Sequence, residues 1–423
     1  MSHVLIFLIQ ALVIVALPVV VLRFSGLRGR IPLVVIQILT GIALGPSFFG
    51  RVAPDMYGIF CNPTALAPLS GIASVAVVVF GLITGLHFDV GIFRSSGRLT
   101  SVAAVANIFF PITLGCAGAM WILLRHPEAL VPGLNPAYFV AAIGLSAAVT
   151  ALPVLGELLR EMRLLGTRIG DVALAVAGIK DVVLYTMLAV LLTLAPVAAH
   201  SSSALGILAG LILVPAYLFV MIRIVRPLLG KMVAVRLQDG MVQERALALV
   251  GAATIASALV VEAIGLSYIL GAFIAGAIMP MNLRKLILDR LQAPTLALMM
   301  PFFFTMTGLR TFVDPHSPAL IEIFVIATLV SVTGIVGGTA LVARYVGETW
   351  RFSLGLGVLL QTKGLLEIVV LTILLDAKII TDNVFAALVL MAVVSTAIAM
   401  PLARLILNWG KSASATSQNA PSR

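Results

Sequence analysis

The sequence predicts an all-α polytopic membrane protein with about 13 transmembrane helices. Of its 423 residues, 61% are hydrophobic and only 10% are charged, and the mean hydropathy is +1.16. So few polar residues cannot cover a water-soluble globule of this size. The apolar residues also fall into runs of roughly 20, the number of helical residues that crosses about 30 Å of hydrocarbon.

The apolar runs follow one another with short connections. We expect spans at 4-22, 31-49, 69-86, 99-124, 137-155, 169-197, 204-222, 246-264, 266-281, 293-309, 319-342, 352-374 and 384-407. Strands of a membrane barrel would alternate apolar and polar residues over about 10 positions, which these runs do not. Positive charge rather than a small-residue cleavage site follows the first run, so we expect a retained span and not a signal peptide.

The basic residues are distributed unequally between the two sides of the membrane. With the N-terminus outside, the outer connections hold only Arg51, Arg125, Arg310 and Lys378. Two more, Lys180 and Lys363, lie within spans, and the other 21 of the 27 fall in cytoplasmic connections and the C-terminal end. The positive-inside rule then predicts an external N-terminus and a cytoplasmic C-terminus in a plasma (inner) membrane, and it explains the net charge of +10 without a nucleic acid.

Thirteen spans divide into six, one linker and six, which places the two halves in opposite orientations as an inverted repeat. Span 5 then corresponds to span 12, and both have polar or helix-breaking residues in mid-run. These residues are Ser146, Thr150 and Pro153 in span 5, and Gln361, Thr362, Lys363, Gly364 and Glu367 in span 12. We expect two discontinuous helices, whose half-helix ends point into a cavity and bind ions.

The pair Lys180-Asp181 lies in the middle of the sixth run, about a dozen residues or roughly 18 Å from Arg168. A charge at mid-bilayer costs roughly 2.5 to 3.5 kcal/mol by insertion scales. Burial favours the protonated form of a carboxyl group, whereas a bare monovalent cation favours the ionised form. Adjacent helical residues do not face each other, so Lys180 is a poor partner for Asp181. We therefore expect Asp181 to bind a proton and a cation in turn.

The other intramembrane charges leave alternatives open. Lys180 either neutralises a carboxylate on another helix, such as Glu367, or carries a proton itself. Lys363 and Glu367 stand at i and i+4, so they either pair with each other or modulate the site. Glu262 lies near the outer end of span 8, where a structural or gating role is expected. Neither the two cysteines nor the five histidines form a metal-ligand pattern, and we expect no cofactor.

Five segments in one order carry a resemblance that covers nearly all of the membrane region. They are QILTGIALGPSFFG at 37-50, AVTALPVLGELL at 148-159, SYILGAFIAGAIMP at 267-280, PFFFTMTGLRT at 301-311 and LGVLLQTKGLLEIVVL at 356-371. Together they resemble the monovalent cation:proton antiporter-2 family, most closely its branch of plant-type cation/proton exchangers.

The resemblance implies the sodium/proton antiporter fold, with crossed discontinuous helices and a homodimer in the lipid bilayer. It implies a transmembrane domain at 1-408, with scaffold spans within 1-98 and 246-309, core spans within 99-197 and 319-407, and a linker span at 204-222. Residues 409-423 are expected to be a disordered cytoplasmic tail. The family's essential aspartate matches Asp181, and the preceding position, usually Asp, Asn or Gln, is Lys180 here.

The resemblance further implies a secondary active antiporter for K⁺ or Na⁺ and protons that works by alternating access, with Asp181 and Thr150 at the ion site and no enzyme activity. If Lys180 keeps its charge throughout, one proton exchanges for one cation and transport is electroneutral, which we favour. A gated potassium efflux channel and a proton-coupled transporter of an organic ion are the alternatives. For the second of these, Lys180 and Lys363 would hold an anionic substrate.

Overall fold

The computed structural model describes residues 3–26, 31–87, 97–195, 216–217, 219–234, 243–263, 267–314 and 317–408. Within these ranges all regular elements are helices, as the sequence predicts. Eight helical stretches of this part are long and apolar enough to cross a membrane, and three shorter apolar helices accompany them. The expected tail at 409-423 and most of the expected linker span at 204-222 lie outside the described residues.

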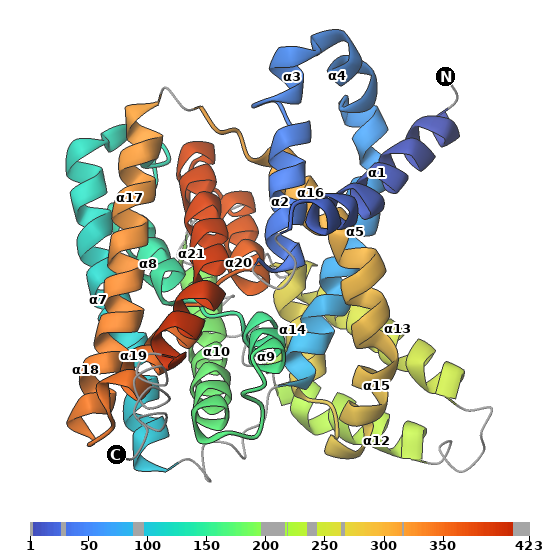
Figure 1. Cartoon of the computed structure of the whole chain (residues 1–423). Coiled ribbons are helices and arrows are strands. Elements are labelled where there is room, and N and C mark those ends of the chain that lie inside the picture. The colour runs from blue at the N-terminus through green and yellow to red at the C-terminus, as the bar shows by residue number, and fades with distance from the viewer. Residues whose placement is uncertain are drawn as a thin grey trace, which may run out of the picture.

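The helices pack into two groups that lie side by side in Figure 1. The group at the right consists of α1 (His3–Phe24), α2 (Leu33–Leu44), α5 (Pro63–Leu86), α13 (Gln243–Ala263), α14 (Tyr268–Ala277), α15 (Met281–Pro294) and α16 (Met300–Arg310). The group at the left consists of α7 (Arg98–Arg125), α8 (Pro136–Ala148), α9 (Leu152–Glu161), α10 (Arg168–Leu194), α17 (Pro318–Val332), α18 (Gly338–Tyr345), α19 (Trp350–Leu360), α20 (Leu365–Asp376) and α21 (Asp382–Asn408).

Several connections between the expected spans are helical, which the sequence reading missed. They contain α3 (Phe49–Val52), α4 (Pro54–Phe60), α12 (Arg226–Ala234) and α15, together with the short turns η1 (Pro127–Ala129) and η2 (Met221–Val225). Single π turns, η4 (Thr295–Met299) and η5 (Thr333–Gly337), join α15 to α16 and α17 to α18. These helices are short and contain charged residues, so a search for long apolar runs does not find them. Figure 1 shows α12 and α15 at the lower edge, opposite α3 and α4.

Close packing of the right-hand helices depends on glycine. A Cβ atom at Gly276 of α14 would lie 2.1 Å from the carbonyl oxygen of Leu82 in α5, and one at Gly41 of α2 would lie 2.3 Å from that of Thr305 in α16. Without a side chain, the backbones of such helices can approach closely. The glycine-rich runs at 41–47 and 271–276 are therefore packing surfaces.

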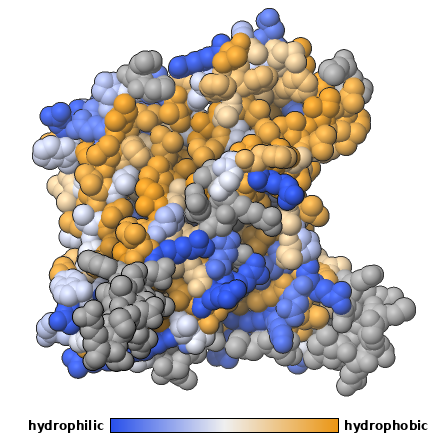
Figure 2. Space-filling model, viewed as in Figure 1, coloured by the Kyte–Doolittle hydropathy of each residue, from blue (hydrophilic) through white to orange (hydrophobic). Residues whose placement is uncertain are grey.

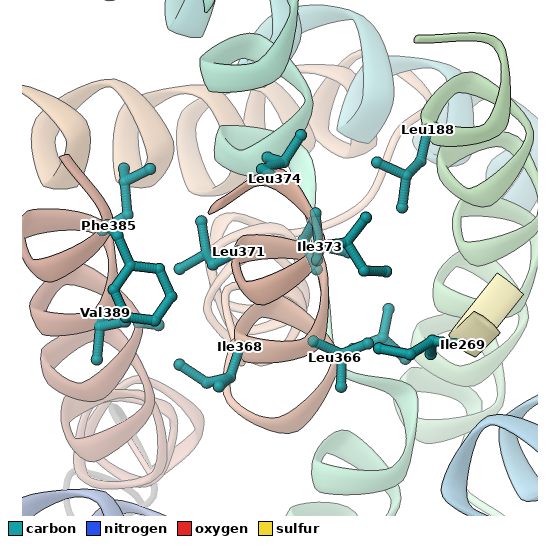
Figure 3. Packing of buried hydrophobic residues seen from close by; sticks show 14 of the residues in the cluster. Leu188, Ile269, Leu366, Ile368, Leu371, Ile373, Leu374, Phe385 and Val389 are labelled. Carbon is teal, nitrogen blue, oxygen red and sulfur yellow. The ribbon is translucent and has the colours of Figure 1, made fainter. Parts of the chain in front are cut away.

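A large apolar core joins the two groups. Figure 3 shows α20 at its centre, with α21 on one side and α10 and α14 on the other. The labelled residues are Leu188, Ile269, Leu366, Ile368, Leu371, Ile373, Leu374, Phe385 and Val389. On the face seen in Figure 2, hydrophobic residues cover the upper and middle parts, and hydrophilic residues gather lower down. The site described below lies within this apolar body.

Candidate functional site

Both expected discontinuous helices are broken, each partway along its expected span. The helix of span 5 stops at the end of α8 and resumes as α9 after residues 149–151, and that of span 12 stops at the end of α19 and resumes as α20 after residues 361–364. Gly364 has φ 110° and ψ −124°, a conformation that only glycine adopts readily. The sequence therefore places a glycine at the break of the second helix, in a backbone conformation that would be strained for a residue with a side chain.

The two breaks cross and bind each other. The backbone N–H of Ala151 donates to the carbonyl oxygen of Thr362 at 2.8 Å, and the hydroxyl of Thr150 donates to the carbonyl oxygen of Leu360 at 2.7 Å. Thr150 and Thr362 are fully buried. The backbone groups that lose their helical partners at the breaks are thus partly satisfied by the opposite chain segment, as hydrocarbon requires.

Lys363 and Glu367 pair with each other across the second break. The Nζ atom of Lys363 lies 3.1 Å from Oε2 of Glu367, and both side chains are fully buried. The same ammonium donates to the carbonyl oxygens of Ser146, Ala147 and Val149 at 2.9 to 3.2 Å, where α8 ends. The hydroxyl of Ser146 donates to the other Glu367 oxygen at 2.5 Å. A cation thus covers the negative end of α8, and an anion lies in the first turn of α20.

Lys180 does not pair with Glu367, contrary to one of the alternatives read from the sequence. Its ammonium donates to the side-chain oxygen of Asn107 in α7 and, at 2.6 Å, to the hydroxyl of Thr150. Among the described residues no carboxylate lies within 4.0 Å of its nitrogen. The Asn107 amide in turn donates to Thr339 of α18 at 2.5 Å. Lys180 is therefore held by neutral oxygens on α7 and on the break between α8 and α9.

The two buried lysines have matching positions. Lys363 binds the carbonyl oxygens at the end of α8 directly, and Lys180 reaches the last carbonyl of α19, that of Leu360, through the Thr150 hydroxyl. Each half-helix that ends at the crossing thus has a cation near its negative pole. This arrangement offers a physical reason for a lysine at position 180.

Asp181 follows Lys180 on α10 but points elsewhere. Its side chain is only 6% exposed, and its Oδ1 atom has no hydrogen-bond partner among the described residues. One turn further along α10, the ring of Tyr185 stacks on Phe273 of α14, with centroids 4.1 Å apart and planes at 21°. A buried carboxylate oxygen without a partner is costly and calls for a proton or a cation.

Glu262 lies away from the crossing. It is exposed near the end of α13, and its Oε2 atom accepts from the backbone N–H of Tyr268 at 2.8 Å, at the start of α14. This contact matches a structural cap. No group of three or more His, Cys, Asp or Glu side chains that could hold a metal ion occurs in the described part of the chain.

Asn107 was not among the predicted site residues. The structure places it, fully buried, next to Lys180. The available signal was a lone amide in the middle of the fourth apolar run, where a polar side chain needs a partner.

Comparisons with known proteins agree with this geometry. A family described as "Sodium/hydrogen exchanger, transmembrane" matches residues 11–409. "Cation/H(+) antiporter 17" of Arabidopsis thaliana is 31% identical over 416 residues, which are 97% of this chain but 50% of that protein. The chain thus spans about half the length of this relative.

A shorter relative matches over nearly its whole length. "Na(+)/H(+) antiporter NhaS4" of Synechocystis sp. is 26% identical over 386 residues, 90% of this chain and 93% of that protein. The solved structure of the sodium proton antiporter MjNhaP1 from Methanocaldococcus jannaschii aligns with a TM-score of 0.54 at 14% identity, covering 96% of this chain and 98% of that one. The fold is that of a sodium/proton antiporter, and the chain belongs to the sodium/hydrogen exchanger family.

Proposed function

We propose that this chain is a secondary active antiporter that exchanges a monovalent cation, K⁺ or Na⁺, for protons. The observation that carries the proposal is a buried Asp181 with an unpartnered oxygen on a helix that packs beside two crossed broken helices. Broken helices of this kind form the ion sites of secondary transporters. The names of the relatives support a cation and a proton as the exchanged ions.

Asp181 is the proposed carrier. A carboxylate shielded from water must gain a proton or bind a cation, so one group can load either but not both. The Thr150 hydroxyl donates to Leu360 and accepts from Lys180, which leaves one lone pair of its oxygen for a passing cation. We therefore keep Thr150 as a proposed ligand, secondary to Asp181.

The proposed stoichiometry is one cation for one proton. Lys180 binds two neutral oxygens near the negative end of α19, contacts that stabilise its charge against the cost of burial, and we take this charge to stay constant through the cycle. Lys363 and Glu367 compensate each other and the half-helix ends, so we assign them a modulating role. With these charges constant, only Asp181 changes its load, and the exchange is electroneutral.

The two groups of helices suggest how the exchange proceeds. We assign the right-hand group of Figure 1 to a scaffold and the left-hand group to a mobile core, with the break segments moving as part of the core. The Tyr185 and Phe273 rings, one on each group, then close one side of the path next to Asp181. We further propose a homodimer in a plasma (inner) membrane, with the N-terminus outside and the C-terminus in the cytoplasm.

Transport by purified protein in liposomes tests the proposal. Liposomes with an acidic interior and a pH-sensitive dye receive K⁺, Na⁺ or Li⁺ outside, and Asp181→Asn protein serves as the control. We expect alkalinisation of the interior by at least one cation and no response from the folded Asp181→Asn protein. A response to no cation, or an unchanged response after Asp181→Asn, would remove the basis for this function.

The alternatives give different results in the same liposomes. An electroneutral exchanger works at the same rate at any imposed potential, whereas a net charge per cycle gains about 2.3 kcal/mol per 100 mV. A potassium channel would carry K⁺ without a pH change when the proton leak is negligible. An organic-ion carrier would move protons only after an organic substrate is added.

A further inference from the structure

A polar hollow of about 420 Å³ lies at one end of the left-hand group of helices, apart from the crossing. It is formed where α9 ends, where α19 begins and where α21 ends. Arg163, Arg351 and Arg404 line it, and Glu161 is the one acidic residue among its described lining residues. Three arginines against one glutamate leave the hollow with an excess of two positive charges.

The elements that carry the three arginines are held together by a second apolar cluster. Leu158 of α9, Leu356 of α19 and Met400 of α21 are buried in this cluster. The helices α19 and α21 also approach closely, because a Cβ atom at Gly355 would lie 2.6 Å from a methyl group of Leu407. Arginines that are distant in sequence are thus presented together by a packed surface.

The positive charges of the hollow are not compensated by carboxylates. In the described part of the chain, none of the three guanidinium groups forms an ion pair, whereas Arg168 nearby pairs with Glu348. Arg351 donates to the carbonyl oxygen of Leu407, in the last turn of α21, and its other N–H groups remain available. Like charges that converge in this way favour an anion between them.

The backbone at Arg163 indicates that its side chain has a function. Its φ of 56° lies in the left-handed region, which glycine adopts most easily. The N–H of Arg163 donates to the carbonyl oxygen of Arg160 at 3.1 Å, and that of Leu164 donates to Leu159 at 2.8 Å, which closes the end of α9. An arginine at a position suited to glycine costs stability, and such costs are typical of functional sites.

We propose that this hollow binds a phosphate group, carried either by an anionic lipid or by free phosphate. The planar guanidinium group matches two phosphate oxygens at once, and one phosphate has enough oxygens to accept from more than one arginine. A water molecule takes up about 30 Å³, so the hollow has room for a phosphate group with water around it. The arginines lie on the side that we proposed to be cytoplasmic, where basic pockets of membrane proteins bind lipid phosphates.

A purely structural role for these arginines predicts a different outcome. Side chains that only offset the negative poles of α9 and α21 would matter for stability and not for ligand binding. The variant Arg163→Gly separates the two roles, because it removes the guanidinium group and supplies the residue that suits the backbone. We expect its stability without ligand to be equal or higher, and its affinity for phosphate to be lower.

Binding to the purified chain in detergent tests the site. Native mass spectrometry counts bound dioleoylphosphatidic acid, and dioleoylphosphatidylcholine, whose choline group offsets the phosphate charge, is the comparison lipid. The unfolding temperature in sodium phosphate, against sodium chloride at equal ionic strength, tests free phosphate. In Arg163→Gly/Arg404→Gln protein, the affinity for the probe that binds should fall about tenfold or more.

A charge-matched control keeps the result interpretable. Arg223→Gln/Arg226→Gln protein also loses two positive charges, but from η2 and α12 in the right-hand group, and should keep its affinity. The single variants Arg163→Gly and Arg404→Gln should each weaken binding, which covers a double variant that fails to fold.

The two probes separate the two sources of the phosphate group. Binding of phosphatidic acid in preference to phosphatidylcholine identifies a lipid, and a rise in unfolding temperature in sodium phosphate identifies a soluble phosphate. Binding of neither probe, equal affinity for the two lipids without an effect of free phosphate, undiminished affinity in the variants of the hollow, or an equal loss in the control would overturn the proposal.

Discussion

Removing the cation of the buried pair Lys363 and Glu367 should cost more stability than removing both charges. Lys363→Met leaves the fully buried Glu367 without its cation, so that its carboxyl group either bears the cost of a buried charge or takes up a proton, and it also strips a donor from three carbonyl oxygens at the end of α8. Loss of one partner of a buried pair typically costs about 3 to 5 kcal/mol. Glu367→Gln should cost less, because Lys363 keeps its three carbonyl acceptors.

The double variant Lys363→Met/Glu367→Gln removes both charges, and we expect it to be more stable than Lys363→Met alone. The coupling energy should reach about 1 to 3 kcal/mol. Reversible unfolding in mixed micelles with increasing dodecyl sulfate, followed by circular dichroism, measures it. The partly exposed pair of Arg51 and Asp314, 3.5 Å apart, is the control and should couple by less than about 1 kcal/mol. Additive losses within about 0.5 kcal/mol would refute the reasoning.

Three further predictions follow from other parts of the structure. Gly276→Ala should destabilise the protein by about 1 to 3 kcal/mol in the same unfolding assay, because its Cβ atom would meet α5, whereas Gly251→Ala, with open space around it, should not. Lys180→Met should lower the free energy of unfolding by only about 1 to 3 kcal/mol, because it leaves a neutral oxygen, and no carboxylate, without a partner. A loss of stability as large as that of Lys363→Met would contradict these contacts. Burial raises the pKa of the Cys61 thiol to about 11. In Cys116→Ala protein, the rate of maleimide labelling should therefore rise about tenfold per pH unit between pH 7 and 10, because the thiolate is the reactive form. A plateau of this rate near pH 9 would disprove the shift.

The apolar runs and the breaks were predictable because they rest on local chemistry. Hydrocarbon requires long apolar helices, and Gly364 with its polar neighbours marks a place where a helix cannot continue. Partner choice was not predictable, because it depends on how helices distant in sequence pack. Because Lys180 and Asp181 are adjacent on one helix, the sequence showed that they would not pair with each other. Nothing in the sequence indicated that Asn107 and Thr150 would bind Lys180 instead.

The pairing of distant segments at the crossing also sets when the site can form during synthesis. Ser146 binds Glu367, which lies 221 residues later in the chain. At a translation rate of about 5 to 20 residues per second, roughly 10 to 45 s pass between the synthesis of the two residues. Until then the end of α8 lacks its cation. A nascent chain that already contains Asp181 therefore lacks the crossed helices, and the proposed ion exchange must await synthesis of α19 and α20.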